Sequence, residues 1–168
     1  MKAVFATRLF ALLLAPAFLF AFTTKGGISN YSGEWKLNES KSELGQFDRF
    51  AVRSIKAEQT EASIAITRTQ PSFNGDDMTS TESLSFDGKE TETTVFENGK
   101  RKATAIWSDD GKNLVISYTL NLEFNGQSME IKGTDTWTVS DDGKTLTVQT
   151  NSSSPQGEFS WKAVYDKQ

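Results

Sequence analysis

The chain lacks the two residue types on which much metal and nucleophilic chemistry depends, because its 168 residues include no cysteine and no histidine. These absences exclude a Ser–His–Asp triad, a thiol nucleophile, a CxxC redox pair and an ordinary zinc or copper site. General acid–base chemistry would fall to carboxylates, lysine or tyrosine. We therefore expect no metal, no cofactor and no enzymatic activity, and the length predicts a single domain.

Basic residues are also fewer than acidic ones. The chain has 18 Lys and Arg against 22 Asp and Glu. Residues 1–24 hold two basic residues and no acidic one, so residues 25–168 carry 16 basic and 22 acidic side chains, a net charge of −6. Such a domain has no electrostatic footprint for nucleic acid and no polybasic patch for anionic lipid. The sequence does not predict an oligomeric state.

The first 24 residues differ in composition from the rest of the chain. Lys2 and Arg8 precede an apolar run over Leu9–Phe22, which contains Pro16. A basic start followed by a short apolar stretch is typical of a secretory signal peptide, and the run is shorter than the roughly twenty residues that span a bilayer. We predict a signal peptide over residues 1–24 and export to the periplasm or the extracellular space.

The cleavage point of this segment stays open. Cleavage after Ala17 fits the small-residue rule, whereas cleavage after Ala21 or around Thr24 removes the whole apolar run. An uncleaved anchor is the alternative. After removal of the segment we expect one domain over residues 25–168 with no integral membrane span.

Glycine-containing turns divide the rest of the chain. Asn-Gly and Asp-Gly are strong hairpin signals, because both residues tolerate positive φ. Between the turns apolar residues alternate with polar ones, as in the run from Leu114 to Phe124, and this period of two is typical of strands. Six turns are predicted in the second half, at Phe86–Lys89, Glu97–Lys100, Asp109–Lys112, Phe124–Gln127, Asp141–Lys144 and Pro155–Glu158.

The first half has the same pattern in a weaker form, and together the two halves predict about ten strands. We expect the segments Phe50–Gln59 and Ala62–Thr69 to pair, and the segments Met78–Phe86 and Lys89–Phe96 to pair. The remaining early strands are predicted at Ser32–Leu37 and Arg101–Trp107.

The short connections between the predicted strands favour one architecture. A β-sandwich needs long crossovers, whereas tight hairpins pair sequential strands. A meander that curls until its last strand meets its first hides one apolar face and both sheet edges. We therefore predict an all-β fold, an antiparallel up-and-down (meander) β-barrel of about 8–10 strands. Closure would bring Trp35 and Leu37 near Trp161 and Tyr165.

One short sequence occurs twice. Ser108–Leu114 and Ser140–Leu146 both contain Ser-Asp-Asp-Gly-Lys, and each follows a strand that carries a tryptophan. We interpret them as equivalent hairpin turns. A duplicated calcium loop is the alternative, because paired Asp residues supply hard oxygen ligands.

Several stretches of the sequence resemble a known superfamily. Gly33-Glu34-Trp35 resembles the Gly-x-Trp signature of the calycins, which include lipocalins and fatty-acid-binding proteins. The stretches Gly33–Gly45, Asp135–Val148 and Val164–Lys167 are similar to exported bacterial lipocalin-like proteins of unassigned function. The resemblance implies a lipocalin-like barrel that carries a small, mostly apolar molecule, with Trp35 as a structural plug at one end.

Two departures limit what the resemblance implies. Fatty-acid-binding proteins have a helical lid between their first two strands, but only twelve residues separate Leu37 from Phe50. Their last strand carries an Arg-x-Tyr pair that binds a carboxylate; Tyr165 matches the tyrosine, but Ala163 stands at the arginine position. We expect a lidless barrel without fatty-acid specificity.

Period-two alternation points a few polar residues toward the apolar face, and an unpaired charge there would be costly. One reading is that Arg53 or Arg68 binds an anionic head group. The alternative is an internal ion pair between Asp135 and one arginine. The full set of candidate ligand-binding residues is Arg53, Arg68, Glu82, Trp107, Tyr118, Asp135, Trp161 and Tyr165.

Three functions stay open. The leading hypothesis is a barrel that binds a small apolar or amphipathic molecule. The second is a cell-envelope interaction module with a filled barrel and no ligand. The third is an enzyme that uses Glu82 and Asp135 as a carboxylate pair. The run Lys100–Lys102 is expected to face solvent or to cap turns.

Overall fold

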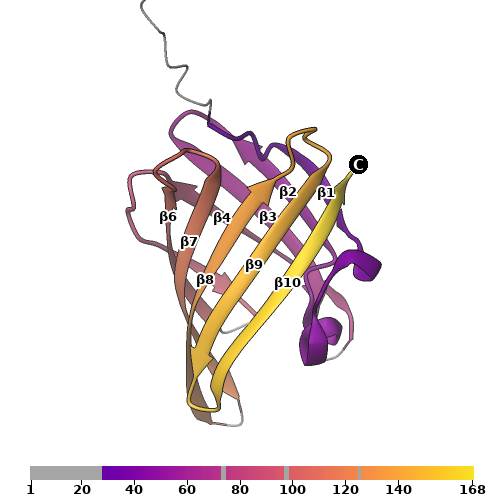
Figure 1. Cartoon of the computed structure of the whole chain (residues 1–168). Coiled ribbons are helices and arrows are strands. Elements are labelled where there is room, and N and C mark those ends of the chain that lie inside the picture. The colour runs from indigo at the N-terminus through magenta and orange to yellow at the C-terminus, as the bar shows by residue number, and fades with distance from the viewer. Residues whose placement is uncertain (1–27, 73–74, 97–98, 125) are drawn as a thin grey trace, which may run out of the picture.

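Strands joined by tight turns make up most of the computed structural model, which describes residues 28–72, 75–96, 99–124 and 126–168. The predicted signal segment, residues 1–24, lies outside the described residues. The elements, drawn in Figure 1, are β1 (Gly33–Leu37), η1 (Glu39–Lys41), η2 (Gly45–Phe50), β2 (Ser54–Gln59), β3 (Ser63–Pro71), β4 (Asp77–Ser85), β5 (Thr91–Val95), β6 (Gly99–Trp107), β7 (Asn113–Phe124), β8 (Gln127–Val139), β9 (Thr145–Ser154) and β10 (Gly157–Lys167).

The ten strands form one sheet in the order β4-β3-β2-β1-β10-β9-β8-β7-β6-β5. All its pairs are antiparallel, and the last strand meets the first, with Leu37 opposite Tyr165. The predicted up-and-down barrel and its closure through β1 and β10 are therefore confirmed (Figure 1).

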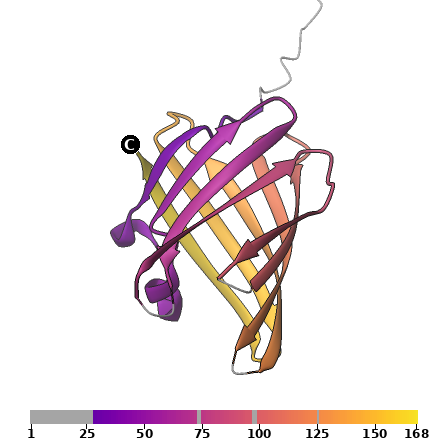
Figure 2. The same cartoon turned by 180° about the vertical axis from the view of Figure 1, so that it is seen from behind.

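The barrel is nearly closed rather than closed, because β4 and β5 are consecutive in the chain but form the two ends of the sheet. The prediction that segments Met78–Phe86 and Lys89–Phe96 pair is wrong. β5 has only five residues, and these pair with β6 alone. Phe86, just beyond β4, packs against Trp107 with ring centroids 5.0 Å apart instead of extending a ladder toward β5. Figure 2 shows this side of the barrel.

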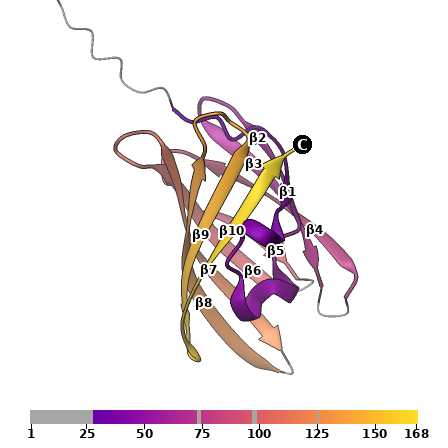
Figure 3. The ribbon, with the colours of Figure 1, turned by 45° about the vertical axis from the view of Figure 1, so that its right-hand side comes forward.

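The connection between β1 and β2 corrects two expectations. The predicted strand Phe50–Gln59 begins only at Ser54, because Phe50 ends the 3₁₀ helix η2. The connection is also not free of helix, since η1 and η2 lie in it beside β10 (Figure 3). Phe47 of η2 packs on Phe159 and Trp161, with ring centroids 5.3 and 4.7 Å apart. Neither helix, nor any other in the described part of the chain, has the length and apolar character to span a membrane.

The repeated Ser-Asp-Asp-Gly-Lys segments form matching turns. The carboxylate of Asp110 accepts hydrogen bonds from the Ser108 hydroxyl at 2.6 Å and the Lys112 amide at 3.0 Å. Asp142 accepts the same two bonds from Ser140 and Lys144, at 2.6 and 3.0 Å. Both carboxylates thus stabilise their own hairpins, as the turn interpretation predicts.

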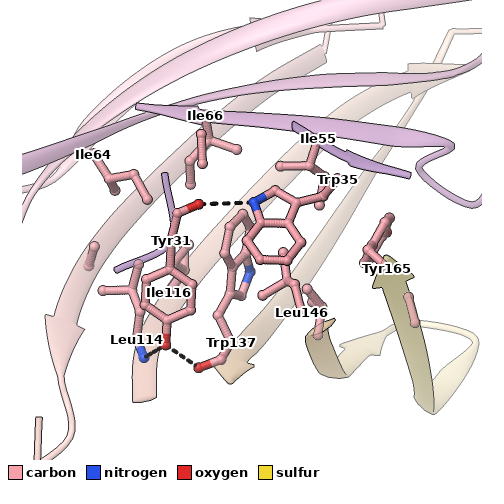
Figure 4. Packing of buried hydrophobic residues seen from close by; sticks show 14 of the residues in the cluster. Tyr31, Trp35, Ile55, Ile64, Ile66, Leu114, Ile116, Trp137, Leu146 and Tyr165 are labelled. Carbon is pink, nitrogen blue, oxygen red and sulfur yellow. Dashed lines mark hydrogen bonds between the residues drawn. The ribbon is translucent and has the colours of Figure 1, made fainter. Parts of the chain in front are cut away.

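We call the end of the barrel that holds Tyr31 and the C-terminus the upper end, and the end with the turn between β9 and β10 the lower end (Figure 1). Large apolar side chains from both walls fill the upper end, and each is less than 2% exposed. Figure 4 shows this packing. The set comprises Tyr31, Trp35, Ile64, Ile66, Leu84, Leu114, Ile116, Trp137 and Leu146.

Tyr31 fixes the segment before β1 to the opposite wall. Its hydroxyl donates to the Trp137 carbonyl at 2.7 Å and accepts from the Leu114 amide at 3.1 Å, while its carbonyl accepts from Trp35 Nε1 at 2.9 Å (Figure 4). Burial raises the pKa of Tyr31 to about 12, so the hydroxyl keeps its proton and can donate. The upper end is therefore tied together by hydrogen bonds as well as by apolar packing.

We predict that Tyr31→Phe lowers the free energy of unfolding by about 1–3 kcal/mol, because it leaves a buried amide and a buried carbonyl without a partner. Urea unfolding measures this change. Ile28→Ala is the control, since Ile28 is 58% exposed and its truncation should alter stability little. Equal stability of Tyr31→Phe and the unaltered chain would contradict the prediction.

Candidate functional site

Four charged side chains lie inside the barrel. Arg68 comes from β3, Glu82 from β4, Arg101 from β6 and Asp135 from β8. Each continues the inward-facing series of its strand, as Glu82 does with Leu84. Their side chains are only 13%, 2%, 12% and 12% exposed, respectively. We call these four residues the interior ion-pair network.

The network is continuous. Arg68 Nη1 donates to one oxygen of Glu82, and Arg101 Nε donates to the other at 3.2 Å. Arg101 Nη2 donates to Asp135 at 3.3 Å, and the hydroxyl of Thr150 on β9 donates to the second Asp135 oxygen at 2.8 Å. Two positive and two negative charges therefore balance within one connected group.

The bond between Arg101 and Glu82 has a structural consequence. It joins β4, at one end of the sheet, to β6, the neighbour of β5 at the other end, and so crosses the place where β4 and β5 form no ladder. A charge-assisted hydrogen bond in a buried setting is stronger than one exposed to water. The network thus holds together the two sides of the barrel that the backbone leaves unjoined.

Tyr118 and Gly133 position Arg101. The guanidinium carbon of Arg101 lies 3.8 Å from the centroid of the Tyr118 ring, in a cation–π arrangement. Tyr118 lies across Gly133 on the neighbouring strand, where a Cβ atom would approach the ring to 2.4 Å. Glycine is therefore required at residue 133 for the ring to lie flat beneath Arg101.

The network sets the ionisation of its members. Burial alone would raise the pKa of Glu82, but the charges of Arg68 and Arg101 and their hydrogen bonds outweigh burial and lower it. Burial likewise opposes the charge on Arg101, yet Glu82 and Asp135 raise its pKa. Glu82 and Arg101 consequently stay ionised at neutral pH. Burial raises the pKa of Tyr118, which stays neutral.

The structure brings some of the predicted residues together. Arg68, Glu82, Tyr118 and Asp135 lie in or against the network, as described above, so the internal ion pair that sequence reasoning kept as an alternative is present. Arg53 does not join them. Its side chain is 53% exposed and lies 4.0 Å from Asp77, because it precedes β2 and stands outside the enclosed part of the barrel. The prediction that Arg53 lies in the interior is wrong.

The predicted aromatic residues are divided between the two ends. Trp35 and Trp107 lie at the upper end, where Trp107 stacks on Tyr31 with ring centroids 5.7 Å apart. Trp161 is half-buried under η2 toward the lower end. Tyr165 is 3% exposed, and the charges of Arg68 and Asp135 act on its hydroxyl.

Sequence reasoning missed Arg101. We expected Lys100–Lys102 to face solvent as a basic run, but Arg101 is buried between its neighbours on the network. The signal was available, because Ala103 and Ala105 face the interior and Arg101 stands two residues before Ala103 on the same strand. The alternation of the strand overrides the composition of the run.

The lower half of the interior differs from the upper half. Six inward-facing apolar side chains on β7, β8 and β10 are only half-buried, although they follow the same alternation as the fully buried ones above them. Solvent therefore reaches the inner wall at this end. These residues, which we call the lower wall, are Leu120, Leu122, Met129, Ile131, Phe159 and Trp161.

A second concave feature lies on the outside. A groove of about 730 Å³ runs over the outer face of β6–β10. Outward-facing Lys102, Thr119, Lys132 and Asn151 contribute to its lining, together with Tyr118 and Gly133, so the groove is of mixed polar and apolar character.

Comparisons with known proteins show the fold. No protein-family model matches the chain, and no curated protein matches its sequence. Among solved structures, the zebrafish ileal bile acid-binding protein in complex with cholic acid is similar, with a TM-score of 0.55 and 18% sequence identity. The similarity covers 83% of this chain and 100% of that chain. The architecture is therefore a nearly closed antiparallel barrel of ten strands, the same fold as that solved structure.

We predict that Glu82→Gln lowers the free energy of unfolding by about 3–5 kcal/mol, because it leaves Arg68 buried without a counter-charge. The double variant Arg68→Leu/Glu82→Leu removes that pair together and keeps the bond between Arg101 and Asp135. It should lose much less stability than Glu82→Gln, as measured by urea unfolding. A double variant as unstable as Glu82→Gln would contradict this account.

The lowered pKa of Glu82 predicts a dependence of stability on pH. The unfolded carboxyl has a pKa of about 4.3, so the stabilisation is fully present above that pH and is lost as the pH falls through the lower folded value. The stability gap between the unaltered chain and Glu82→Gln should therefore narrow below about pH 4. Urea titrations from neutral to acidic pH measure the gap, and other carboxylates cancel because both proteins share them. A gap that is constant with pH would contradict the prediction.

Proposed function

We propose that this protein binds a small, mostly apolar molecule in the lower half of its barrel. The observation that carries the proposal is the lower wall, six apolar side chains that face inward and yet remain partly exposed. A ligand that covers this apolar surface gains binding free energy, because each Å² of apolar surface removed from water contributes roughly 25 cal/mol. A site of this kind pairs apolar walls with few polar groups.

The polar groups of the proposed site lie above the lower wall. Tyr118 is the inward-facing residue of β7 that precedes Leu120, and its ring lies against Arg101 of β6. Arg101 in turn pairs with Glu82 and Asp135. Phe47 of η2 covers Phe159 and Trp161 beside the lower end, so η2 is the element that a ligand passes. The arrangement suits an amphipathic molecule with its apolar part near the lower end.

The structural similarity supports this proposal. The similar zebrafish protein is a bile acid-binding protein and was solved with cholic acid, a small amphipathic molecule. Its sequence identity of 18% establishes the shared fold, so the ligand of this chain rests on the chain's own residues. We assign the site to Arg68, Glu82, Tyr118, Asp135, Trp161 and Tyr165, and we add Arg101.

We propose further that the protein acts outside the cytoplasm. The basic and apolar pattern of residues 1–24 supports a signal peptide, and the resemblance to exported bacterial lipocalin-like proteins supports the same location. The net charge of −6 after that segment favours neither nucleic acid nor anionic lipid as a partner.

The same network supports a non-enzymatic role. The carboxyl pair Glu82 and Asp135 is bound to Arg101, and the lowered pKa of Glu82 leaves it without the proton that a general acid must donate. We therefore propose binding rather than catalysis.

The outer groove favours a second candidate function, an interaction module of the cell envelope. Its lining includes the charged side chains of Glu90, Lys102, Lys132 and Glu158, which suit a partner with polar groups. An apolar docking surface is not supported, because the exposed large hydrophobic side chains of the described residues are Ile28 and Ile106, which fall short of a functional patch of roughly 300–600 Å².

Titration with Nile red, a neutral apolar dye, tests the proposed function. We expect saturable binding to one site with increased dye fluorescence. Leu120→Lys should weaken binding at least about tenfold, because it places an unpaired charge in the lower wall. Thr119→Lys, which adds the same charge on the outer face of the same strand, should change binding less than about twofold.

Circular dichroism establishes that both lysine variants are folded. Absence of saturable dye binding to the unaltered chain would contradict the proposed function. A loss of binding confined to Thr119→Lys would instead place the site in the outer groove, which Thr119 lines.

A further inference from the structure

Two hydrogen-bond donors inside the barrel have no partner among the described residues. They are Arg68 Nη2 and Trp137 Nε1, both buried. The guanidinium carbon of Arg68 lies 5.8 Å from the centroid of the Trp137 ring, so the two groups are neighbours. The other fully buried indole, that of Trp35, donates to the Tyr31 carbonyl at 2.9 Å.

Tyr165 adds a third polar group at the same place. It is 3% exposed, and its hydroxyl forms no hydrogen bond within the described part of the chain. It lies opposite Leu146 in the β9–β10 ladder, and both residues belong to the same buried cluster as Trp137. Two free donors that neighbour each other and one free hydroxyl thus lie within one buried core.

The chemistry of these groups specifies what they lack. Buried donors in folded proteins are almost always paired, so an acceptor is required here. One oxygen that accepts two hydrogen bonds of about 2.9 Å links donors up to roughly 5.8 Å apart. A hydroxyl, ester or ketone oxygen meets this requirement, and a hydroxyl can also donate to Tyr165.

The charges of the network determine whether the ligand's oxygen-bearing group is charged or neutral. Arg68 and Arg101 are already balanced by Glu82 and Asp135. A ligand carboxylate would bring a third negative charge next to two buried carboxylates, where little solvent screens the repulsion. A neutral oxygen accepts hydrogen bonds from the two free donors without that repulsion.

We propose that the ligand of this barrel is an uncharged amphiphile whose oxygen-bearing end accepts hydrogen bonds from Arg68 Nη2 and Trp137 Nε1. Its apolar chain extends toward the lower wall. This inference rests on the proposed function and names the ligand class. It also replaces the anionic head group that sequence reasoning assigned to Arg53 or Arg68, since Glu82 already neutralises Arg68.

Three probes with the same apolar chain test the ligand class: decan-1-ol, decanoate and 1-chlorodecane. Each competes with Nile red on the unaltered protein at about pH 8, where decanoate is fully ionised. We expect decan-1-ol to displace the dye at a concentration about tenfold lower than decanoate or 1-chlorodecane, because only the alcohol supplies a neutral oxygen acceptor. Decanoate that competes as well as decan-1-ol, or better, would overturn the inference.

Indole N–H resonances give a second, independent readout. The chain has four tryptophans, so the ¹⁵N-labelled protein shows four such signals, which triple-resonance spectra assign. Decan-1-ol should move the Trp137 signal downfield, and 1-chlorodecane should not. Trp35 is the internal control, since its Nε1 already has a partner.

The outcomes separate this inference from the proposed function. If Nile red binds but decan-1-ol and 1-chlorodecane compete equally and leave the Trp137 signal in place, the barrel binds apolar molecules, a water molecule serves as the acceptor, and the inference is overturned. If neither Nile red nor any decane derivative binds, the proposed function itself fails.

Discussion

The pairing of four buried charges, those of Arg68, Glu82, Arg101 and Asp135, is the constraint on which the interior of the barrel depends. Backbone hydrogen bonds join nine pairs of neighbouring strands, but none joins β4 to β5. Side chains connect the two sides of that gap: the Arg101 guanidinium contacts Glu82 at 3.2 Å and Asp135 at 3.3 Å, and Phe86 packs on Trp107. Buried charges are costly unless they are paired, so the removal of one partner leaves another charge buried without a counter-charge. The barrel therefore gains its closure from side chains where the backbone does not supply it.

The same network divides the interior. Above it, Trp35, Trp137 and their apolar neighbours form the buried core of the upper end. Below it, the lower wall keeps apolar side chains half-exposed. A barrel filled throughout would need no ligand, and a barrel empty throughout would have little core to stabilise it without disulfides. Because of this division, the upper half of the interior provides stability, while the lower half presents an apolar surface to a ligand.

Sequence reasoning succeeded where one local rule decides the outcome. Asp-Gly and Asn-Gly turns and two-residue alternation predicted the strands, the meander and the meeting of Leu37 with Tyr165. Alternation also pointed Arg68, Glu82 and Asp135 inward. It failed where a second effect competes. Arg53 precedes its strand, so alternation does not apply to it. Arg101 stands in a basic run whose composition suggested solvent. The gap beside β5 depends on where Phe86 packs, which no local pattern specifies.

The central claim is that the network, and not the backbone, holds β4 beside β6. The chain has no cysteine, so introduced cysteines can be spin-labelled without competition. Labels at Ser83→Cys and Lys102→Cys, on exposed outward positions of β4 and β6, report the distance across the gap by pulsed electron resonance. Labels at Lys102→Cys and Thr119→Cys, partners in the β6–β7 ladder, are the control. The account predicts a narrow β4–β6 distance distribution that broadens in Glu82→Gln while the control stays narrow. A β4–β6 distribution that Glu82→Gln leaves unchanged would contradict it.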